Sequence, residues 1–173
     1  MLDGMRRNAG FTLIELLITI TILVVLVTLT VVNLRSNEIK ARDDQRKTDV
    51  TSIAQQLENF YRSGSDDPNS FLSHTDQYPP TVLMDSESDI KATLQEVDTR
   101  TLRAPGVADT DPISLTIATD GSQPTPDLNV YVYQPLKSDG TICQSLTDEC
   151  RKFNLYYLQE SDSTVQKVTS KHQ

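Results

Sequence analysis

Residues 6–15 read RRNAGFTLIE, and residues 16–32 continue as LLITITILVVLVTLTVV. Two arginines and a glycine precede Phe11, which opens an apolar run whose only charged side chain is that of Glu15. No Gly or Pro interrupts the run from Phe11 to Val32. A helix of this length spans about 33 Å, enough to cross a hydrocarbon core of about 30 Å. The stretch therefore predicts a membrane-spanning helix near the start of the chain.

The carboxylate of Glu15 is the unusual feature of this run. A charge inside a membrane helix costs about 2.5–3.5 kcal/mol at the bilayer centre and less near its edge. The run holds no cation that could pair with Glu15. Cleavage before Phe11 would create a free amine, and this amine on a neighbouring subunit could neutralise Glu15. The alternative is a carboxylate that reaches the membrane interface and pairs with nothing.

The complete pattern RRNAGFTLIELL resembles the class III signal of type IV pilins and type II secretion pseudopilins. The resemblance implies that prepilin peptidase cleaves after Gly10 and that the new N-terminal residue, Phe11, is N-methylated. Glu15 would then be the fifth mature residue and an assembly contact. The implied protein is not an enzyme. It is a structural subunit that membrane assembly machinery adds to a helical filament by self-association.

The resemblance also implies a location: a single-pass precursor in the cytoplasmic membrane and a filament outside the cell or at its surface. The basic residues conflict with this orientation. Arg6 and Arg7 precede the span but five basic residues follow it within residues 35–47, which by the positive-inside rule would place the C-terminal part in the cytoplasm. We give the more specific leader motif precedence. The alternative function is a single-pass anchored binding protein with an uncleaved N-terminus. For a filament subunit, the sequence does not decide between a pilus and a pseudopilus, or between a major and a minor subunit.

The apolar helix is expected to continue as a second, amphipathic half. Residues 35–47 are polar almost all round and predict a connecting segment with a solvated face. A single apolar stripe at helical spacing follows, typical of a helix that packs on a sheet. Its members are Val50, Ile53, Ala54, Leu57, Phe60 and Tyr61. Arg62, Gly64 and Pro68 are stop signals, so the helix should end near Arg62. ARDDQRKTDVTSIAQQLENFY and the later Tyr78-Pro79-Pro80 resemble major pseudopilins in the same region.

The remaining residues predict a small β-rich domain. Acidic residues at 85–89 open a short helix to about Val97. Four runs rich in β-branched and aromatic residues predict an antiparallel sheet, at residues 113–119, 128–134, 153–158 and, as an edge strand, 164–169. The expected fold is therefore α+β and pilin-like. Its parts are a leader (1–10), a transmembrane assembly helix (11–34), an amphipathic second half (35–63) and a globular domain (64–173).

Cys143 and Cys150 are close enough in sequence to form a disulfide in an oxidising compartment, with free thiols as the alternative. Zinc would need four ligands, and the two histidines, His74 and His172, have no ligand spacing. We therefore expect no cofactor.

A loose acidic cluster is the one candidate for calcium, although it lacks the spacing of an EF-hand loop. Its members are Asp109, Asp111, Asp120 and Asp127. Residues 64–173 hold eight basic and seventeen acidic side chains, a balance that disfavours direct binding to nucleic acid.

Overall fold

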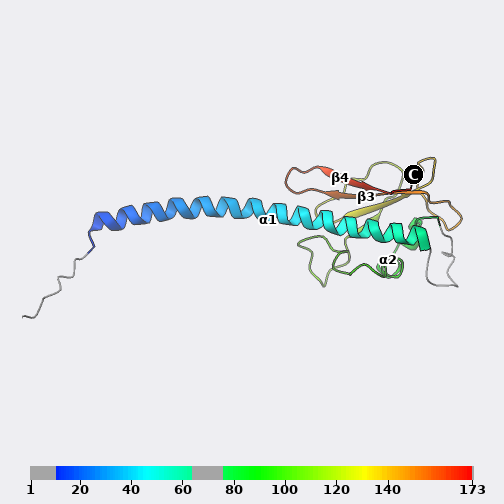
Figure 1. Ribbon diagram of the computed structural model, residues 1–173, viewed down its shortest axis with the longest axis horizontal. Helices are drawn as coiled ribbons and strands as arrows, with labels where there is room; N and C mark the ends of the chain where they lie inside the picture. Colours follow the sequence, from blue (N-terminus) through cyan, green and yellow to red (C-terminus); the bar gives the residue numbers. More distant parts are fainter. Residues whose placement is uncertain (1–10, 64–75, 173) are drawn as a thin grey trace, which may run out of the picture. The chain divides into compact units, whose positions relative to one another are not determined.

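The computed structural model describes residues 11–63 and 76–172, so the leader residues 1–10 lie outside the described part of the chain. The chain forms two compact units, Met1–Ile39 and Lys40–Gln173. A single helix, α1 (Leu13–Ser63), runs through both, and the other elements belong to the second unit (Figure 1). The domain boundaries expected from the sequence at residues 10, 34 and 63 stay predictions.

The end of α1 lies one residue beyond the predicted position. In the last turn, the Arg62 side chain donates to the carbonyl of Glu58 at 3.3 Å. The hydroxyl of Ser63 donates to the carbonyl of Asn59 at 2.8 Å. Both are i to i−4 bonds from a side chain to a carbonyl of the preceding turn, so the two side chains fold back along the last turn of the helix.

Four strands form one sheet in the order β1-β2-β3-β4, so each strand lies beside its neighbour in sequence (Figure 1). The strands are β1 (Leu115–Ile117), β2 (Tyr131–Leu136), β3 (Lys152–Leu158) and β4 (Val165–Thr169). The β2–β3 and β3–β4 pairs are antiparallel. The α+β, pilin-like architecture expected from the sequence is therefore confirmed.

One part of the topology was wrongly predicted: β1 pairs with β2 in parallel, so the sheet is mixed. Residues 118–130 form a long connection that returns the chain to the same end of the sheet. Parallel neighbours require a crossover of about a dozen residues or more, and this connection is long enough to provide it.

β2 continues through Pro135, where the sequence indicated a strand ending at Gln134. Proline lacks the N–H that a central strand needs. The carbonyl of Pro135 accepts from the Cys143 N–H at 2.9 Å, which places the proline nitrogen on the side of β2 away from β3. Since β1 pairs only with residues 131–133, no β1 partner lies beside Pro135.

The main core forms where the predicted stripe of α1 packs on one face of the sheet. Val50, Ile53 and Leu57 are completely buried, which confirms the periodicity of this segment. The facing side chains of the sheet are Tyr131, Tyr133, Phe153, Leu155 and Tyr157. A short helix, α2 (Glu87–Thr93), adds Ile90 to this core, and Met84, which directly follows the 3-10 turn η1 (Thr81–Leu83), and Leu94, which directly follows α2, also belong to it. A smaller cluster of Ala118, Val132 and Tyr156 forms separately.

The polar part of α1 is more buried than the sequence indicated. Asp43 and Arg46 lie in the stretch predicted to be solvated, yet their exposed fractions are 7% and 2%. Asp49, just after it, is also 7% exposed. The prediction was wrong here because hydrophobic periodicity cannot detect a helix face that packs through ion pairs and hydrogen bonds.

Candidate assembly interface

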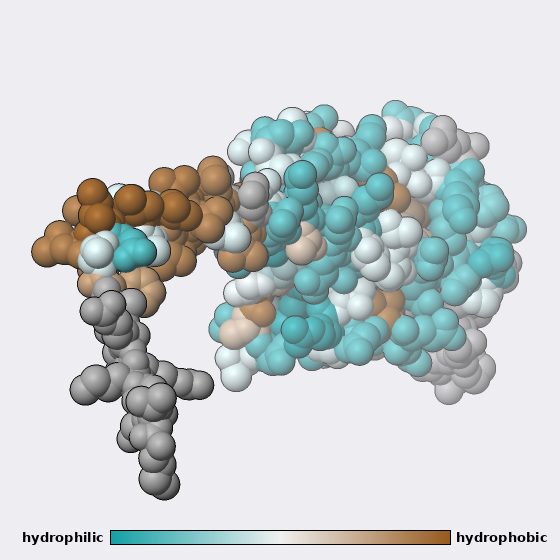
Figure 2. Space-filling view, turned by 60° about the vertical axis from the view of Figure 1, so that its left-hand side comes forward, coloured by the Kyte–Doolittle hydropathy of each residue, from teal (hydrophilic) through white to brown (hydrophobic). Residues whose placement is uncertain are grey.

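The first part of α1 exposes an unbroken apolar surface. Phe11 is 84% exposed and Leu13 is 82% exposed, and the large side chains onward to Leu34 remain mostly accessible. Figure 2 shows this surface as a brown patch of hydrophobic side chains. By length and composition the helix could cross a membrane. A contiguous exposed apolar surface is typical of a site that contacts a membrane or another protein.

The threonines of this segment are compatible with an apolar environment because their hydroxyls bond to the helix itself. Thr28 donates to the carbonyl of Val24 at 2.8 Å, and Thr30 donates to the carbonyl of Leu26 at 2.6 Å. Thr19 and Thr21 make similar bonds. Every polar group in a bilayer needs an internal partner, and these side chains have one.

Glu15 takes part in a local contact that sequence reasoning missed. Its carboxylate accepts from the Thr12 N–H at 3.1 Å and from the Thr12 hydroxyl at 3.0 Å. The Glu15 N–H donates to the Thr12 hydroxyl oxygen at 3.3 Å. This reciprocal pattern is a capping box, which satisfies backbone donors at the start of a helix. Its signal, a threonine followed three residues later by glutamate, is visible in the sequence at Thr12.

The capping box defines what Glu15 lacks. Thr12 supplies hydrogen-bond donors but no positive charge, so the charge of the carboxylate stays uncompensated within this chain's described N-terminal unit. Gly10 lies outside the described residues, and Phe11 directly precedes the capping threonine in an exposed position. The assigned roles of Gly10, Phe11 and Glu15 in cleavage, methylation and assembly remain predictions.

Cys143 and Cys150 form a disulfide in the connection between β2 and β3. Both cysteines are completely buried in the main core. The carbonyl of Cys143 accepts from Thr81 N–H at 3.0 Å, and the carbonyl of Cys150 accepts from Tyr78 N–H at 2.9 Å. The disulfide loop thus anchors the segment that follows residue 75, in addition to joining two strands.

A group of ion pairs, here called the helix clamp, fixes the β3–β4 connection to α1. It consists of Arg42, Asp43, Arg46 and Glu160. Arg42 binds Glu160 with two nitrogens at 2.6 and 2.8 Å, and Arg46 binds both acids, at 3.1 Å to Asp43 and 3.2 Å to Glu160. Asp43 also accepts the N–H groups of residues 160 and 161 at 2.7 and 3.0 Å. The hydrogen bonds from Arg42, with those from Arg46, hold the pKa of Glu160 below its ordinary value.

Each aspartate of the acidic cluster has its own protein partner. Asp109 faces Arg100 at 3.4 Å, Asp111 accepts from the Ala108 N–H at 3.3 Å, and Asp127 accepts from the Asn129 N–H at 2.7 Å. Asp120 accepts from both the N–H and the hydroxyl of Ser122. Within residues 11–63 and 76–172, no three acidic, histidine or cysteine side chains converge to hold a metal ion. The expectation that the protein needs no cofactor stays a prediction.

Comparisons with known proteins point to the same N-terminal stretch. Residues 5–31 match the family model of the prokaryotic N-terminal methylation motif. The chain is 37% identical over 65 residues to a type II secretion system core protein G of Dickeya chrysanthemi. That similarity covers 38% of this chain and 42% of the relative, so it spans less than half of either protein. No solved structure matches the chain.

Proposed function

We propose that this chain, which carries the prokaryotic N-terminal methylation motif and is similar to type IV pilins and type II secretion pseudopilins, is a structural subunit of a helical filament. The subunit would be made as a prepilin in the cytoplasmic membrane and cleaved between Gly10 and Phe11. Membrane assembly machinery would then transfer it to a pilus or pseudopilus. Its partners would be prepilin peptidase, that machinery, the lipid bilayer and further copies of itself.

The exposed apolar surface of α1 is the observation that carries this proposal. The described large apolar side chains between Phe11 and Leu34 are exposed. A bilayer covers such a helix before assembly, and a bundle of identical helices covers it afterwards. Because the same surface is covered in both states, transfer from membrane to filament exchanges one apolar environment for another. The free-energy difference between the two states therefore depends on the few polar groups of the helix.

Glu15 would be the polar group that favours the filament. In lipid its charge is costly, and no cation pairs with it among residues 11–63 and 76–172. In a bundle, the cleaved N-terminal amine of a neighbouring subunit would supply the missing positive charge. The capping box supports this reading, because it orients the carboxylate at the start of the helix while leaving its charge uncompensated. A charge-assisted hydrogen bond in a dry interior is strong, and it would specify how neighbouring helices align.

The experiment is to determine the N-terminus of the protein isolated from membranes. Mass spectrometry should find a chain that begins at N-methylated Phe11. An intact Met1 would overturn the proposal and favour a single-pass anchored binding protein. The sequence of the globular unit holds no recognised catalytic motif, and we propose a structural role for it in the filament.

A further inference from the structure

A small hollow on the surface of the globular unit, here called the arginine hollow, has a volume of about 170 Å³. One wall belongs to α1, and the other belongs to the turns that follow α2. The lining residues are Arg42, Gln45, Arg100, Arg103, Ala104, Pro105, Gly106, Val107 and Asp109. A water molecule occupies about 30 Å³ in the liquid, so the hollow has room for a group the size of about six waters. This volume suits a small polyatomic anion better than a drug-sized ligand.

The segment that carries Arg100 and Arg103 is fixed to the core of the globular unit. Leu102 and Ala104, on either side of Arg103, are almost completely buried. The Leu102 carbonyl accepts from the Ser114 N–H at 2.7 Å, and the Ala104 N–H donates to the Ser114 hydroxyl oxygen at 2.8 Å. The backbone at Arg103 is therefore held on both sides. A backbone that is already ordered reduces the entropy that ligand binding would cost.

The Arg103 guanidinium is oriented, while most of its donors stay unused. Its Nε–H donates to the carbonyl of Asp111 at 3.0 Å. In the described part of the chain, no carboxylate forms an ion pair with Arg103. The hydrogen bond from Lys91 is the main reason that the pKa of Glu87 lies below its ordinary value, and the charge of Arg103 adds to this effect. Because a guanidinium carries five N–H donors, the terminal nitrogens of Arg103 remain available for a ligand.

Arg100 and the backbone of Gly106 supply further donors in the lining. The Arg100 side chain lies 3.4 Å from Asp109, but both side chains are largely exposed, so this ion pair is weak. Gly106 has a φ of +95°, in the left-handed region that favours glycine. Its N–H has no acceptor within the part of the chain that the structure describes, and no side chain of its own covers it.

Arg42 belongs to the wall of the hollow and not to the contacts with a ligand. Its guanidinium already binds Glu160 through two nitrogens in the helix clamp. Apart from that pair, the lining holds two basic side chains, Arg100 and Arg103, and one acidic side chain, Asp109, a balance of +1. The whole chain has a formal net charge of −8. A locally positive hollow in an acidic protein favours an anion at this place.

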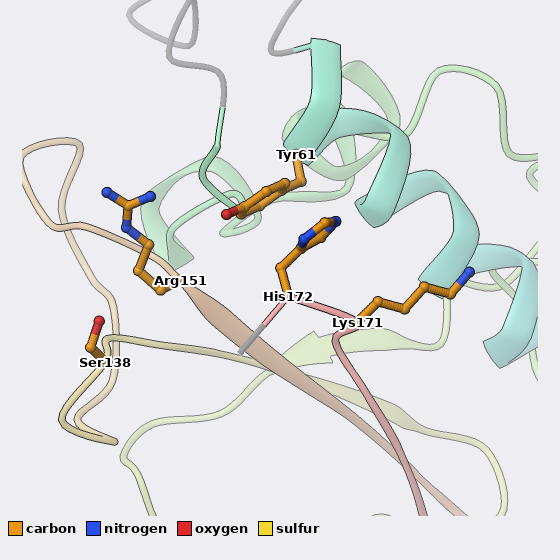
Figure 3. A pocket seen from close by; sticks show the side chains of 5 residues that line it. All are labelled: Tyr61, Ser138, Arg151, Lys171 and His172. Atoms are coloured by element: carbon orange, nitrogen blue, oxygen red, sulfur yellow. The ribbon is translucent and has the colours of Figure 1, made fainter.

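A larger hollow of about 510 Å³ is also lined by basic side chains, but they are arranged differently. Its Arg151 and Lys171 lie at opposite ends and point away from each other (Figure 3). One small anion cannot contact both of them. The arginine hollow has one third of this volume, and its two available arginines, Arg100 and Arg103, lie three residues apart on one fixed segment. It is therefore the hollow that fits a small anion.

We propose that the arginine hollow binds a phosphate group. The terminal nitrogens of Arg100 and Arg103 bind the phosphate oxygens, and the Gln45 amide and the Gly106 N–H supply the remaining donors. A carboxylate has two oxygens in one plane, which a single guanidinium fork satisfies. A phosphate group directs its oxygens to several sides and so matches donors from both walls. A phosphate monoester also carries a charge of about −1.5 to −2 at pH 7, which strengthens its attraction to the two arginines.

Two sources can supply this group: the headgroup of an anionic phospholipid and a soluble phosphate ester. The lipid source rests on the proposed function, in which a bilayer holds the precursor. The phosphate chemistry of the hollow belongs to the single subunit and depends neither on cleavage after Gly10 nor on filament assembly.

The test uses the full chain in micelles of an uncharged detergent, with glycerol 3-phosphate as the soluble probe. Titration followed by NMR should shift the backbone amide signals of Gly106 and Arg103, and acetate at the same ionic strength should not. Arg103→Gln should weaken binding about tenfold, equivalent to about 1.4 kcal/mol. Asp109→Asn should strengthen binding several-fold, because it removes the acid that competes for Arg100. A gain in affinity cannot arise from a loss of folded protein.

Lys167→Gln is the matched control, because it removes one positive charge from an exposed residue of β4 outside the hollow. Binding that Lys167→Gln and Arg103→Gln reduce equally would overturn the proposal, since it would reflect net charge alone. Equal responses to acetate and glycerol 3-phosphate would also overturn it. So would an Asp109→Asn variant that binds no more tightly than wild type.

Nanodiscs separate the two sources. With no soluble phosphate present, the Gly106 amide signal should differ between discs that contain phosphatidylglycerol and discs of phosphatidylcholine alone, and Arg103→Gln should remove this difference. That result assigns the site to a lipid headgroup. A response to glycerol 3-phosphate without a response to the lipid assigns it to a soluble ester, and no response to either overturns the proposal. A mature chain that begins at Met1 would refute the proposed filament subunit and leave these results unchanged.

Discussion

At the scale of single residues, buried Asp49 is a group whose ionisation links the stability of the fold to pH. It lies on α1 with an exposed fraction of 7%, and its carboxylate accepts a hydrogen bond from the Tyr131 hydroxyl at 3.2 Å. Burial raises the pKa of Asp49 from its ordinary 3.8 to about 6, and the Tyr131 hydrogen bond only partly opposes this rise. Burial of the charged form is therefore unfavourable, and the folded state binds the proton more tightly than the unfolded state does.

The first prediction is that stability falls as the pH rises through this window. Between pH 4 and pH 6 the unfolded chain has already released the Asp49 proton while the folded protein retains it. The contribution of Asp49 to the free energy of unfolding therefore declines by about 2–3 kcal/mol over this range and is constant above pH 7. Asp49→Asn removes the titration and keeps an acceptor for Tyr131. The variant should be more stable than wild type at pH 7 and equally stable near pH 3.

Thermal unfolding of both proteins at the two pH values provides the measurement. Asp44→Asn is the control, because Asp44 lies on the same part of α1 with an exposed side chain. The Asp44 variant should show no comparable gain at pH 7. An Asp49→Asn variant whose difference from wild type is the same at both pH values would show that Asp49 ionises normally in the folded protein.

The second prediction separates the two roles of Glu15. Glu15→Gln retains an oxygen that can accept from Thr12, so the helix should begin normally, but the charge is lost. If the N-terminal amine of a neighbour pairs with Glu15, the amine is then buried alone in the filament at a cost of about 3–5 kcal/mol. The precursor should insert in the membrane and be cleaved, while filaments should be absent by electron microscopy.

Thr12→Ala is the matched variant for this experiment. It removes the hydroxyl that takes part in the capping box but leaves the Glu15 charge. Filaments should therefore form, although the first turn of α1 should be slightly less stable. Loss of a capping residue costs only about 1 kcal/mol. Normal filament numbers with Glu15→Gln would assign Glu15 to capping alone and would remove it from the assembly contact.

At the scale of elements, the disulfide constrains the connection between β2 and β3. Leu136 and Ile142 pair as an isolated bridge at the start of this loop, and the Cys143–Cys150 bond closes the remainder. The loop also supplies the carbonyls that bind Tyr78 and Thr81. Opening the bond should therefore loosen the segment around η1 in addition to the loop itself.

The third prediction concerns how much the loss of the disulfide destabilises the globular unit and which residues it loosens. Replacing both cysteines by alanine should lower the free energy of unfolding of the globular unit by about 2–3 kcal/mol, as expected for a short closed loop. Hydrogen exchange should quicken at Tyr78 and Thr81 and stay unchanged in the helix before residue 40. Two titratable thiols in the unreduced protein would contradict the disulfide.

At the scale of the whole molecule, the two units differ in how their apolar side chains are covered. The globular unit encloses its own core between α1 and the sheet and uses the helix clamp for the polar part of the helix. The described large apolar side chains of the N-terminal unit are exposed, and under the proposed function lipid or other copies of the chain would cover them. Mutations should therefore be able to affect the folding of the globular unit and the placement of the N-terminal unit separately.

The fourth prediction uses the cleavage site to separate them. Gly10→Val adds a branched side chain next to the bond that the peptidase would cut, so the variant should stay uncleaved in the membrane. Its globular unit should keep the disulfide and the unfolding temperature of wild type, because no core residue changes. Gel mobility and intact mass report cleavage. Normal removal of ten residues from this variant would refute the assignment of Gly10.

The sequence by itself determined the features that depend on local periodicity and composition. The apolar run at residues 11–32 required a helix because lipid offers its backbone no other partners. The stripe from Val50 to Phe60 specified which helix face packs on the sheet, and the short spacing of Cys143 and Cys150 allowed their bond. Each signal lies within a few residues and needs no knowledge of distant segments.

Only the tertiary structure decided the features built from segments far apart in the chain. Whether β1 runs parallel or antiparallel to β2 depends on the path of residues 118–130, which no local pattern records. Arg46 is buried because Glu160 and the carbonyl of Leu128 reach it, although they lie more than eighty residues away. Tyr61, Arg151 and His172, which line one surface hollow, likewise come from distant parts of the chain. Polar contacts carry no sequence period, so their positions follow from the completed fold and not from the pattern of residues.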